Sequence, residues 1–64
     1  MSYLSAREKS GLTQREVADA IGIDQSAVSF WETGKTSPRA ALLPKIASLY
    51  GCTLDELLKE EVEQ

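Results

Sequence analysis

Histidine is absent from this chain, and cysteine occurs only once, at Cys52. A zinc site built from Cys and His, an intramolecular disulfide and any His-dependent catalysis are therefore excluded. No stretch approaches the roughly 18 consecutive apolar residues of a membrane span. The first ten residues also lack the apolar core of a signal peptide. We expect a cytoplasmic protein that is not an enzyme, holds no metal or other cofactor and does not contact a membrane.

An excess of basic charge is missing as well, since the formal net charge is −3. Nucleic-acid binders normally carry a basic surface, so this balance argues against a simple one. The distribution weakens the objection. Residues 1–45 hold six basic and five acidic side chains, whereas residues 46–64 hold one basic and five acidic ones. The acidity therefore gathers near the C-terminus, where it need not face DNA.

The length of 64 residues allows one domain, near the lower limit for folding without disulfides or metal. Helix start and stop signals divide it. Thr13 and Glu16 form a capping-box pattern, Gly22 can end the helix that follows, and Asp24 can cap the next one. Pro44 must lie in the first turn of its helix. The pattern predicts an all-α domain over 1–58 with five short helices at about 3–10, 14–21, 25–32, 41–50 and 54–58, no strands, and a polar acidic tail at 59–64.

The second and third helices have contrasting faces. On the second, Val17, Ala18 and Ile21 fall on one apolar stripe. On the third, Val28 and Trp31 point toward the core, and at 100° per residue the opposite side points away from it. The outward face of the third helix then consists of Gln25, Ser26, Ser29 and Phe30. Glutamine and serine can hydrogen-bond base edges, and phenylalanine can pack on a thymine methyl.

At these residues the chain resembles the lambda-repressor-like (Cro/Xre-type) helix-turn-helix domains. The matching segments are Leu4 and Arg7, then GLTQREVADAIGIDQSAVSFWETGK, then Pro38 and LLPKIASLYGCTLDELL, so the resemblance covers nearly the whole chain. It implies a compact five-helix bundle with the helix-turn-helix at helices two and three. It also implies a sequence-specific DNA-binding transcriptional regulator, expected to be a repressor, that inserts helix 25–32 into the major groove.

The resemblance assigns roles position by position. The outward-face residues Gln25, Ser26, Ser29 and Phe30 would contact bases, and the phosphate contacts would come from Gln14, Arg15, Thr33, Lys35, Thr36 and Arg39. Gln14 would also support Gln25, the first residue of the reading helix. Arg7 and Glu32 would form an ion pair between the first helix and the end of the third, and surface pairs of this kind contribute little stability.

The implied partner is double-stranded DNA carrying a pseudo-palindromic operator, bound by a homodimer whose reading helices lie about 34 Å apart. The dimer contact is expected around the last helix, and no small-molecule ligand is predicted. Phe30 could belong to the dimer surface instead of contacting a base. A second interpretation is a protein-interaction module on the same fold, antitoxin-like or regulator-binding, that engages a partner through the apolar side chains Leu54, Leu57, Leu58 and Val62. Asp55 and Glu56 fit helix capping better than acid–base chemistry.

Overall fold

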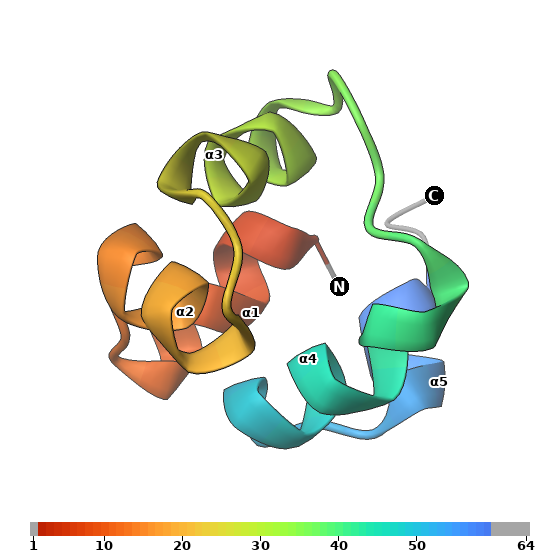
Figure 1. Ribbon diagram of the computed structural model, residues 1–64. Coiled ribbons are helices and arrows are strands. Elements are labelled where there is room, and N and C mark those ends of the chain that lie inside the picture. The colour runs from red at the N-terminus through yellow and green to blue at the C-terminus, as the bar shows by residue number, and fades with distance from the viewer. Residues whose placement is uncertain (1, 60–64) are drawn as a thin grey trace.

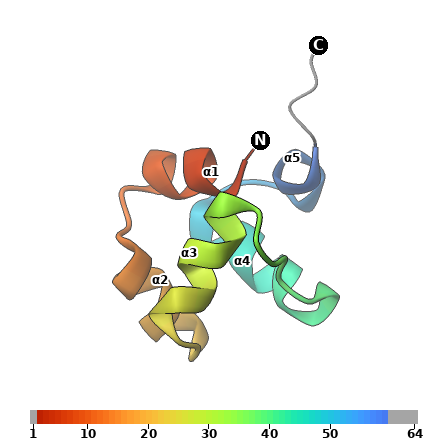
Figure 2. The ribbon, with the colours of Figure 1, turned by 90° about the horizontal axis from the view of Figure 1, so that it is seen from above.

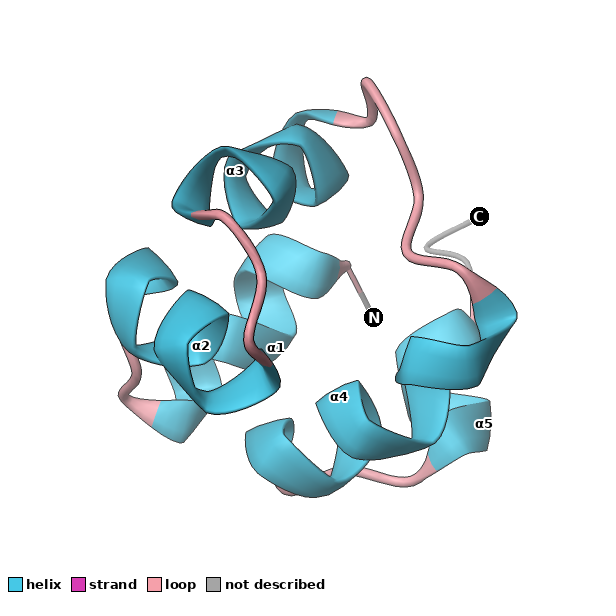
Figure 3. Cartoon of the chain, in the orientation of Figure 1, coloured by secondary structure: helices cyan, strands magenta, loops and turns pink. Residues whose placement is uncertain are grey.

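The computed structural model describes residues 2–59 and, within them, consists of helices without any strand (Figures 1 and 3). The elements are α1 (Tyr3–Ser10), α2 (Gln14–Ile21), α3 (Gln25–Thr33), a short 3₁₀ helix η1 (Ala40–Leu42), α4 (Leu43–Tyr50) and α5 (Leu54–Leu58). The predicted all-α class with five α-helices is confirmed. No helix in this part of the chain has both the length and the apolar character needed to cross a bilayer.

The helix starts follow from local capping. The Ser2 side chain accepts a hydrogen bond from the Ser5 N–H, and Asp24 accepts one from Ser26 N–H. Thr13 forms a complete capping box with Glu16, as predicted. Thr53 and Glu56 form a second one at α5, so the carboxylate of Glu56 is engaged with backbone. Each cap satisfies N–H groups that a helix start otherwise leaves unpaired.

Two predicted helix boundaries were inaccurate. We expected the fourth helix to begin near Ala41, but residues 40–42 form the 3₁₀ turn and α4 begins at Leu43, with Pro44 in its first turn. Proline fits there because its missing N–H would be unpaired at a helix start anyway. The turn before it has no side-chain cap and tightens into 3₁₀ geometry. The third helix extends one residue further than expected, to Thr33.

Every α-helix contributes to a single hydrophobic core. Its buried side chains are Ala6, Val17, Ala18, Val28, Trp31, Ile46, Ala47, Tyr50 and Leu57. The helix α4 lies centrally, since it contacts α1, α2 and α5 (Figure 2). It is nevertheless not buried all round, because its Leu43 and Leu49 side chains remain partly exposed.

The apolar edge predicted near the C-terminus is only partly exposed in the structure. Leu57 is only 2% exposed and belongs to the core, so it is not available to a partner. Leu54 and Leu58 are 41% and 47% exposed on the other side of α5. Val62 and the tail from 60 onward lie outside the described residues, so the boundary at 58 stays a prediction.

Candidate nucleic-acid interface

The turn between α2 and α3 sets how the two helices cross. Gly22 adopts φ 85°, a left-handed conformation that side-chain-bearing residues rarely take. The carbonyl of Ala18 accepts hydrogen bonds from the N–H groups of Gly22 and Ile23, at 2.8 and 3.0 Å. Ile23 then packs against the core while Asp24 starts α3. The chain therefore turns within three residues, and α3 packs against α2 (Figure 1).

The two sides of α3 have different environments. On the inner side Val28 is fully buried and Trp31 is 6% exposed, with its ring 6.3 Å from that of Tyr3 on α1. On the opposite side, Gln25, Ser26 and Phe30 are exposed and Ser29 is half-buried. The predicted inward residues are confirmed. The outward face lies on a helix that is firmly held from behind.

At the start of α3 the side chain of Ser26 is already occupied. Its hydroxyl donates to the carboxylate of Asp24, which also accepts from the Ser26 N–H at 3.0 Å. The hydroxyl bond first, and then the backbone bond, lower the pKa of Asp24. Asp24 therefore stays ionised at neutral pH and places a negative charge at this end of the outward face. Ser26 can still offer its oxygen lone pairs as acceptors.

At the other end of α3, the carbonyl of Phe30 organises the loop that follows. It accepts hydrogen bonds from Lys35 N–H at 2.9 Å, Thr36 N–H at 3.4 Å and the Thr33 hydroxyl at 3.2 Å. The Lys35 ammonium lies over the Phe30 ring, 5.1 Å from its centroid, which is within cation–π range. The sequence prediction missed this pairing. A glycine helix end at Gly34 followed directly by lysine could have indicated it, since such an end folds the chain back onto the last turn.

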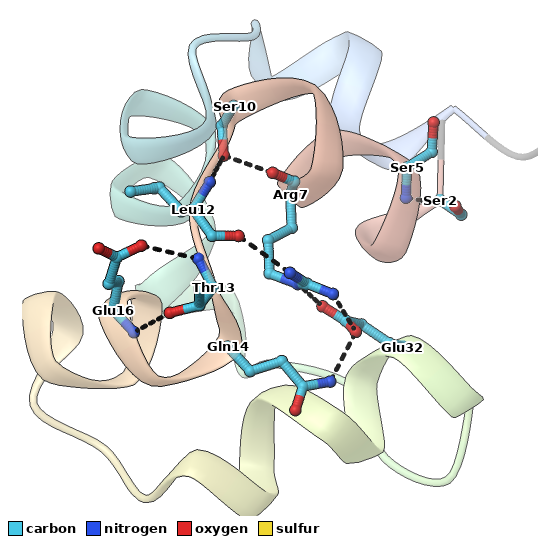
Figure 4. Close-up of polar contacts among 9 residues, drawn as sticks. All are labelled: Ser2, Ser5, Arg7, Ser10, Leu12, Thr13, Gln14, Glu16 and Glu32. Carbon is cyan, nitrogen blue, oxygen red and sulfur yellow. Dashed lines mark hydrogen bonds and ion pairs between the residues drawn. The ribbon is translucent and has the colours of Figure 1, made fainter.

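A polar network under α3 joins three helices (Figure 4). The guanidinium of Arg7 donates to both carboxylate oxygens of Glu32, at 2.5 and 3.2 Å, and to the carbonyl of Leu12 at 2.9 Å. The Gln14 amide donates to Glu32 at 2.8 Å. The side chains of Arg7 and Glu32 are only 15% and 5% exposed. The predicted ion pair is thus confirmed. It is largely buried, however, so the small stabilising contribution that is typical of surface ion pairs does not apply to it.

The ionisation of this network is well defined. Burial acts to raise the pKa of Glu32, but the hydrogen bonds from Arg7 and Gln14 outweigh it and the pKa is lowered. The hydrogen bond to Glu32 raises the pKa of Arg7 further. Both groups therefore remain charged around neutral pH. The carboxylate of Glu32 acts as the common acceptor for α1 and α2 at the end of α3.

The support expected from Gln14 to Gln25 is replaced by this contact with Glu32. The reason is geometric: the turn at 22–24 brings the end of α2 to the start of α3, so Gln14, at the first position of α2, lies at the far end of α3. The remaining predicted phosphate contacts, Arg15, Thr33, Lys35, Thr36 and Arg39, are all exposed. Within residues 2–59, the guanidinium groups of Arg15 and Arg39 make no hydrogen bond or ion pair with another side chain.

Nothing in the described part of the chain suggests another kind of site. No group of three or more Cys, Asp or Glu side chains there could hold a metal ion. Burial raises the pKa of the Cys52 thiol, which makes it a poorer nucleophile. The burial of Pro38, which lies in the loop between α3 and η1, was not predicted from the sequence.

A glycine turn between two short helices, the second of which presents a polar face, defines a helix-turn-helix architecture. The comparison with known proteins gives the particular group: a family model described as Helix-turn-helix matches residues 4–57. The chain belongs to this family, in its Cro/Xre-type, lambda-repressor-like form. It is a DNA-binding domain of the kind found in transcriptional regulators.

Three similar proteins illustrate the range of regulators that this chain resembles. The HTH-type transcriptional regulator PuuR of Escherichia coli (strain K12) is 39% identical over 54 residues, 84% of this chain and 29% of PuuR. The HTH-type transcriptional activator BcrR of Enterococcus faecalis is 36% identical over 55 residues, 86% of this chain and 27% of BcrR. The cryptic phage CTXphi transcriptional repressor RstR of Vibrio cholerae is 33% identical over 54 residues, 84% of this chain and 49% of RstR.

The chain thus spans less than a third of the length of PuuR or BcrR. No solved structure matches it significantly.

Proposed function

We propose that this chain binds a pseudo-palindromic operator as a homodimer and represses transcription, with α3 lying in the major groove. The observation that carries the proposal is the contrast between the two sides of α3, since Val28 and Trp31 fix it in the core while the outward face stays accessible. A helix held in this way can enter a groove without losing its packing. Because its target is DNA, we also propose a cytoplasmic location.

We assign base contacts to the outward face, Gln25, Ser26, Ser29 and Phe30, and phosphate contacts to Gln14, Arg15, Thr33, Lys35, Thr36 and Arg39. Two features support this division. The free cationic groups flank α3 on the neighbouring α2 and on the loop after it, as positioning contacts require. Gln14 is held by Glu32 through its amide nitrogen, so its orientation is set before DNA arrives.

Fewer observations bear on whether the chain represses or activates transcription. Among the relatives, RstR is named a repressor and BcrR an activator. Repression requires only that the domain occupies the operator, whereas activation also requires contact with another protein. We therefore propose repression as the activity that this fold can perform by itself.

A salt titration on duplex DNA tests the proposal. We expect the affinity for a duplex selected from a random pool to fall by about tenfold or more between about 50 and 200 mM salt, because phosphate contacts release counterions. Gln25→Ala should relax base preference, whereas Lys35→Ala should weaken binding similarly on all sequences and reduce the salt slope by about one. Binding that ignores salt, or no duplex captured at all, would contradict the proposal.

The second candidate, a protein-interaction module, is favoured by one observation: Leu54 and Leu58 leave an apolar edge exposed on α5. Leu54→Ser combined with Leu58→Ser separates the two functions. If the double variant keeps full affinity for a single half-site, that edge is not needed for reading DNA. If the wild-type chain binds no DNA, the interaction module becomes the better interpretation.

A further inference from the structure

Phe30 is the only one of the four aromatic side chains that lies exposed, with 37% of its surface accessible. Trp31 and Tyr50 are buried in the core, and Tyr3 packs against it. A single exposed apolar residue is common on protein surfaces and needs no explanation by itself. Phe30, however, stands on the outward face of α3, whose other members, Gln25, Ser26 and Ser29, are polar.

A second observation is that Lys35 lies beside the Phe30 ring. The Lys35 ammonium lies 5.1 Å from the ring centroid, and the Lys35 N–H is bonded to the Phe30 carbonyl at 2.9 Å. The side chain and the backbone of Lys35 are therefore both fixed relative to Phe30. An apolar ring and a cation form one unit at the end of the outward face.

On the basis of the proposed function, we propose that Phe30 and Lys35 form a subsite for the C5-methyl group of a pyrimidine. The phenyl ring contacts the methyl group, and the ammonium contacts the adjacent phosphate. The ring has no donor or acceptor, and the apolar group that bases offer in the major groove is the C5-methyl of thymine. The cation beside it matches the phosphates that border the groove.

The chemistry of this subsite extends to modified DNA. A 5-methylcytosine carries its methyl group at the same position as thymine, so a phenyl ring can contact either. Deoxyuridine keeps the hydrogen-bonding edge of thymine and lacks only the methyl. The subsite therefore distinguishes pyrimidines with a C5-methyl group from those without one, which makes operator affinity sensitive to cytosine methylation at this position.

The experiment uses the duplex selected from a random pool, with each thymine replaced singly by deoxyuridine. We expect one thymine per half-site at which the replacement weakens wild-type binding about fourfold, as expected for burying one methyl group. Phe30→Ala should bind the thymine and deoxyuridine duplexes equally. Placing cytosine at the same position should weaken binding, and 5-methylcytosine should restore about fourfold of that loss.

Matched variants isolate the ring. Phe30→Leu keeps an apolar side chain and should retain part of the preference for the methyl, which also covers the case in which Phe30→Ala folds poorly. Leu4→Ala removes an exposed apolar side chain from α1 and should leave the preference unchanged. Lys35→Gln should lower affinity for the thymine and deoxyuridine duplexes alike and reduce the salt slope by about one.

The outcomes separate this inference from the function on which it rests. If binding is salt-dependent but no deoxyuridine replacement weakens it, or if Phe30→Ala keeps the same discrimination, the methyl subsite is wrong and the proposed function stands. If no duplex is bound, both are wrong. If Phe30→Ala instead abolishes self-association in sedimentation without DNA, the ring belongs to a protein contact.

Discussion

The hydroxyl of Tyr50 is a polar group buried in an apolar core. The side chain is 5% exposed in the core, and its hydroxyl is buried without a hydrogen-bond partner among residues 2–59. Burial first, and then the nearby Glu32 carboxylate, raise the pKa of Tyr50 to about 12. A buried hydroxyl without a partner costs stability, because its hydrogen bonds to water are lost on folding.

We predict that Tyr50→Phe raises the free energy of unfolding by about 1 kcal/mol, because the ring stays and only the unpaired hydroxyl leaves. The dependence of the unfolding free energy on alkaline pH should change too. The folded pKa lies above the ordinary value of 10, so the titration of this phenol leaves the free energy of unfolding unchanged below about pH 10 and lowers it as the pH rises toward 12, a loss that Tyr50→Phe should remove. Urea unfolding at pH 7 and at pH 10–11 measures both effects.

Tyr3→Phe is the matched control, since that residue lies at the edge of the core rather than within it. If Tyr50→Phe lowered the stability at pH 7, the hydroxyl would have a partner that the structure does not include, such as a buried water. In that case the loss of stability at high pH would also be smaller than predicted.

Residue contacts divide into those that a sequence can reveal and those that it cannot. Val28 and Trp31 were predictable because the helical period alone sets which side they face. The contact of Gln14 with Glu32 was not, because the residues are 18 positions apart and their approach depends on how α2 and α3 cross. The burial of Pro38 depends likewise on the core beneath the loop.

At the scale of elements, the start of α3 combines a good cap with an unfavourable charge. Asp24 accepts a hydrogen bond from the Ser26 N–H and so satisfies the helix end, but its ionised carboxylate stands at the start of the face that we propose enters the groove, where it repels the negatively charged DNA. Asparagine caps a helix about as well as aspartate and carries no charge. The two contributions can therefore be separated by one substitution.

We predict that Asp24→Asn leaves the thermal stability nearly unchanged and strengthens binding to the selected duplex about two- to fivefold at low salt, with the gain fading as salt screens the charge. Fluorescence anisotropy over a salt series measures it. Asp55→Asn, on α5, makes the same chemical change away from α3 and should not alter affinity. An equal gain from both variants would show that net charge matters rather than position.

The elements themselves were largely predictable because their signals are local. The predicted capping box at Thr13 is confirmed, and it involves residues only three positions apart, as does the second box at Thr53. The start of the fourth helix was not predictable to the residue. Pro44 limits how early that helix can begin, but the choice between 3₁₀ and α geometry in residues 40–42 depends on packing against α4.

At the scale of the whole molecule, we expect the low positive charge to make a single domain a weak DNA binder. The net charge is −3, and the basic side chains near α3 are few. Two linked domains overcome this weakness, because the second one binds at the high local concentration that the first creates. The proposed homodimer would therefore be needed for tight binding rather than being an optional refinement.

We predict that affinity depends on the helical phase of the two half-sites. With centres about 10 bp apart the two copies of α3 face the same side of the DNA, and inserting about 5 bp should weaken binding by about a hundredfold. Gel-shift assays on duplexes with graded spacers measure this. The reference is an isolated half-site, whose affinity the mis-phased duplex should approach. Affinity that did not vary with spacing would mean that each domain binds alone.

In α3, the residues proposed to contact DNA are different from the residues that hold the core, and this affects which substitutions the domain can tolerate. Substitutions at Gln25, Ser26, Ser29 or Phe30 leave the core untouched, so the preferred operator can drift while the protein remains folded. Glu32 has no such freedom, because its carboxylate ties α1 and α2 to the end of the same helix. The four outward positions of α3 can therefore change while Glu32 stays fixed, and we expect new base preferences to be reachable one position at a time without first acquiring extra stability.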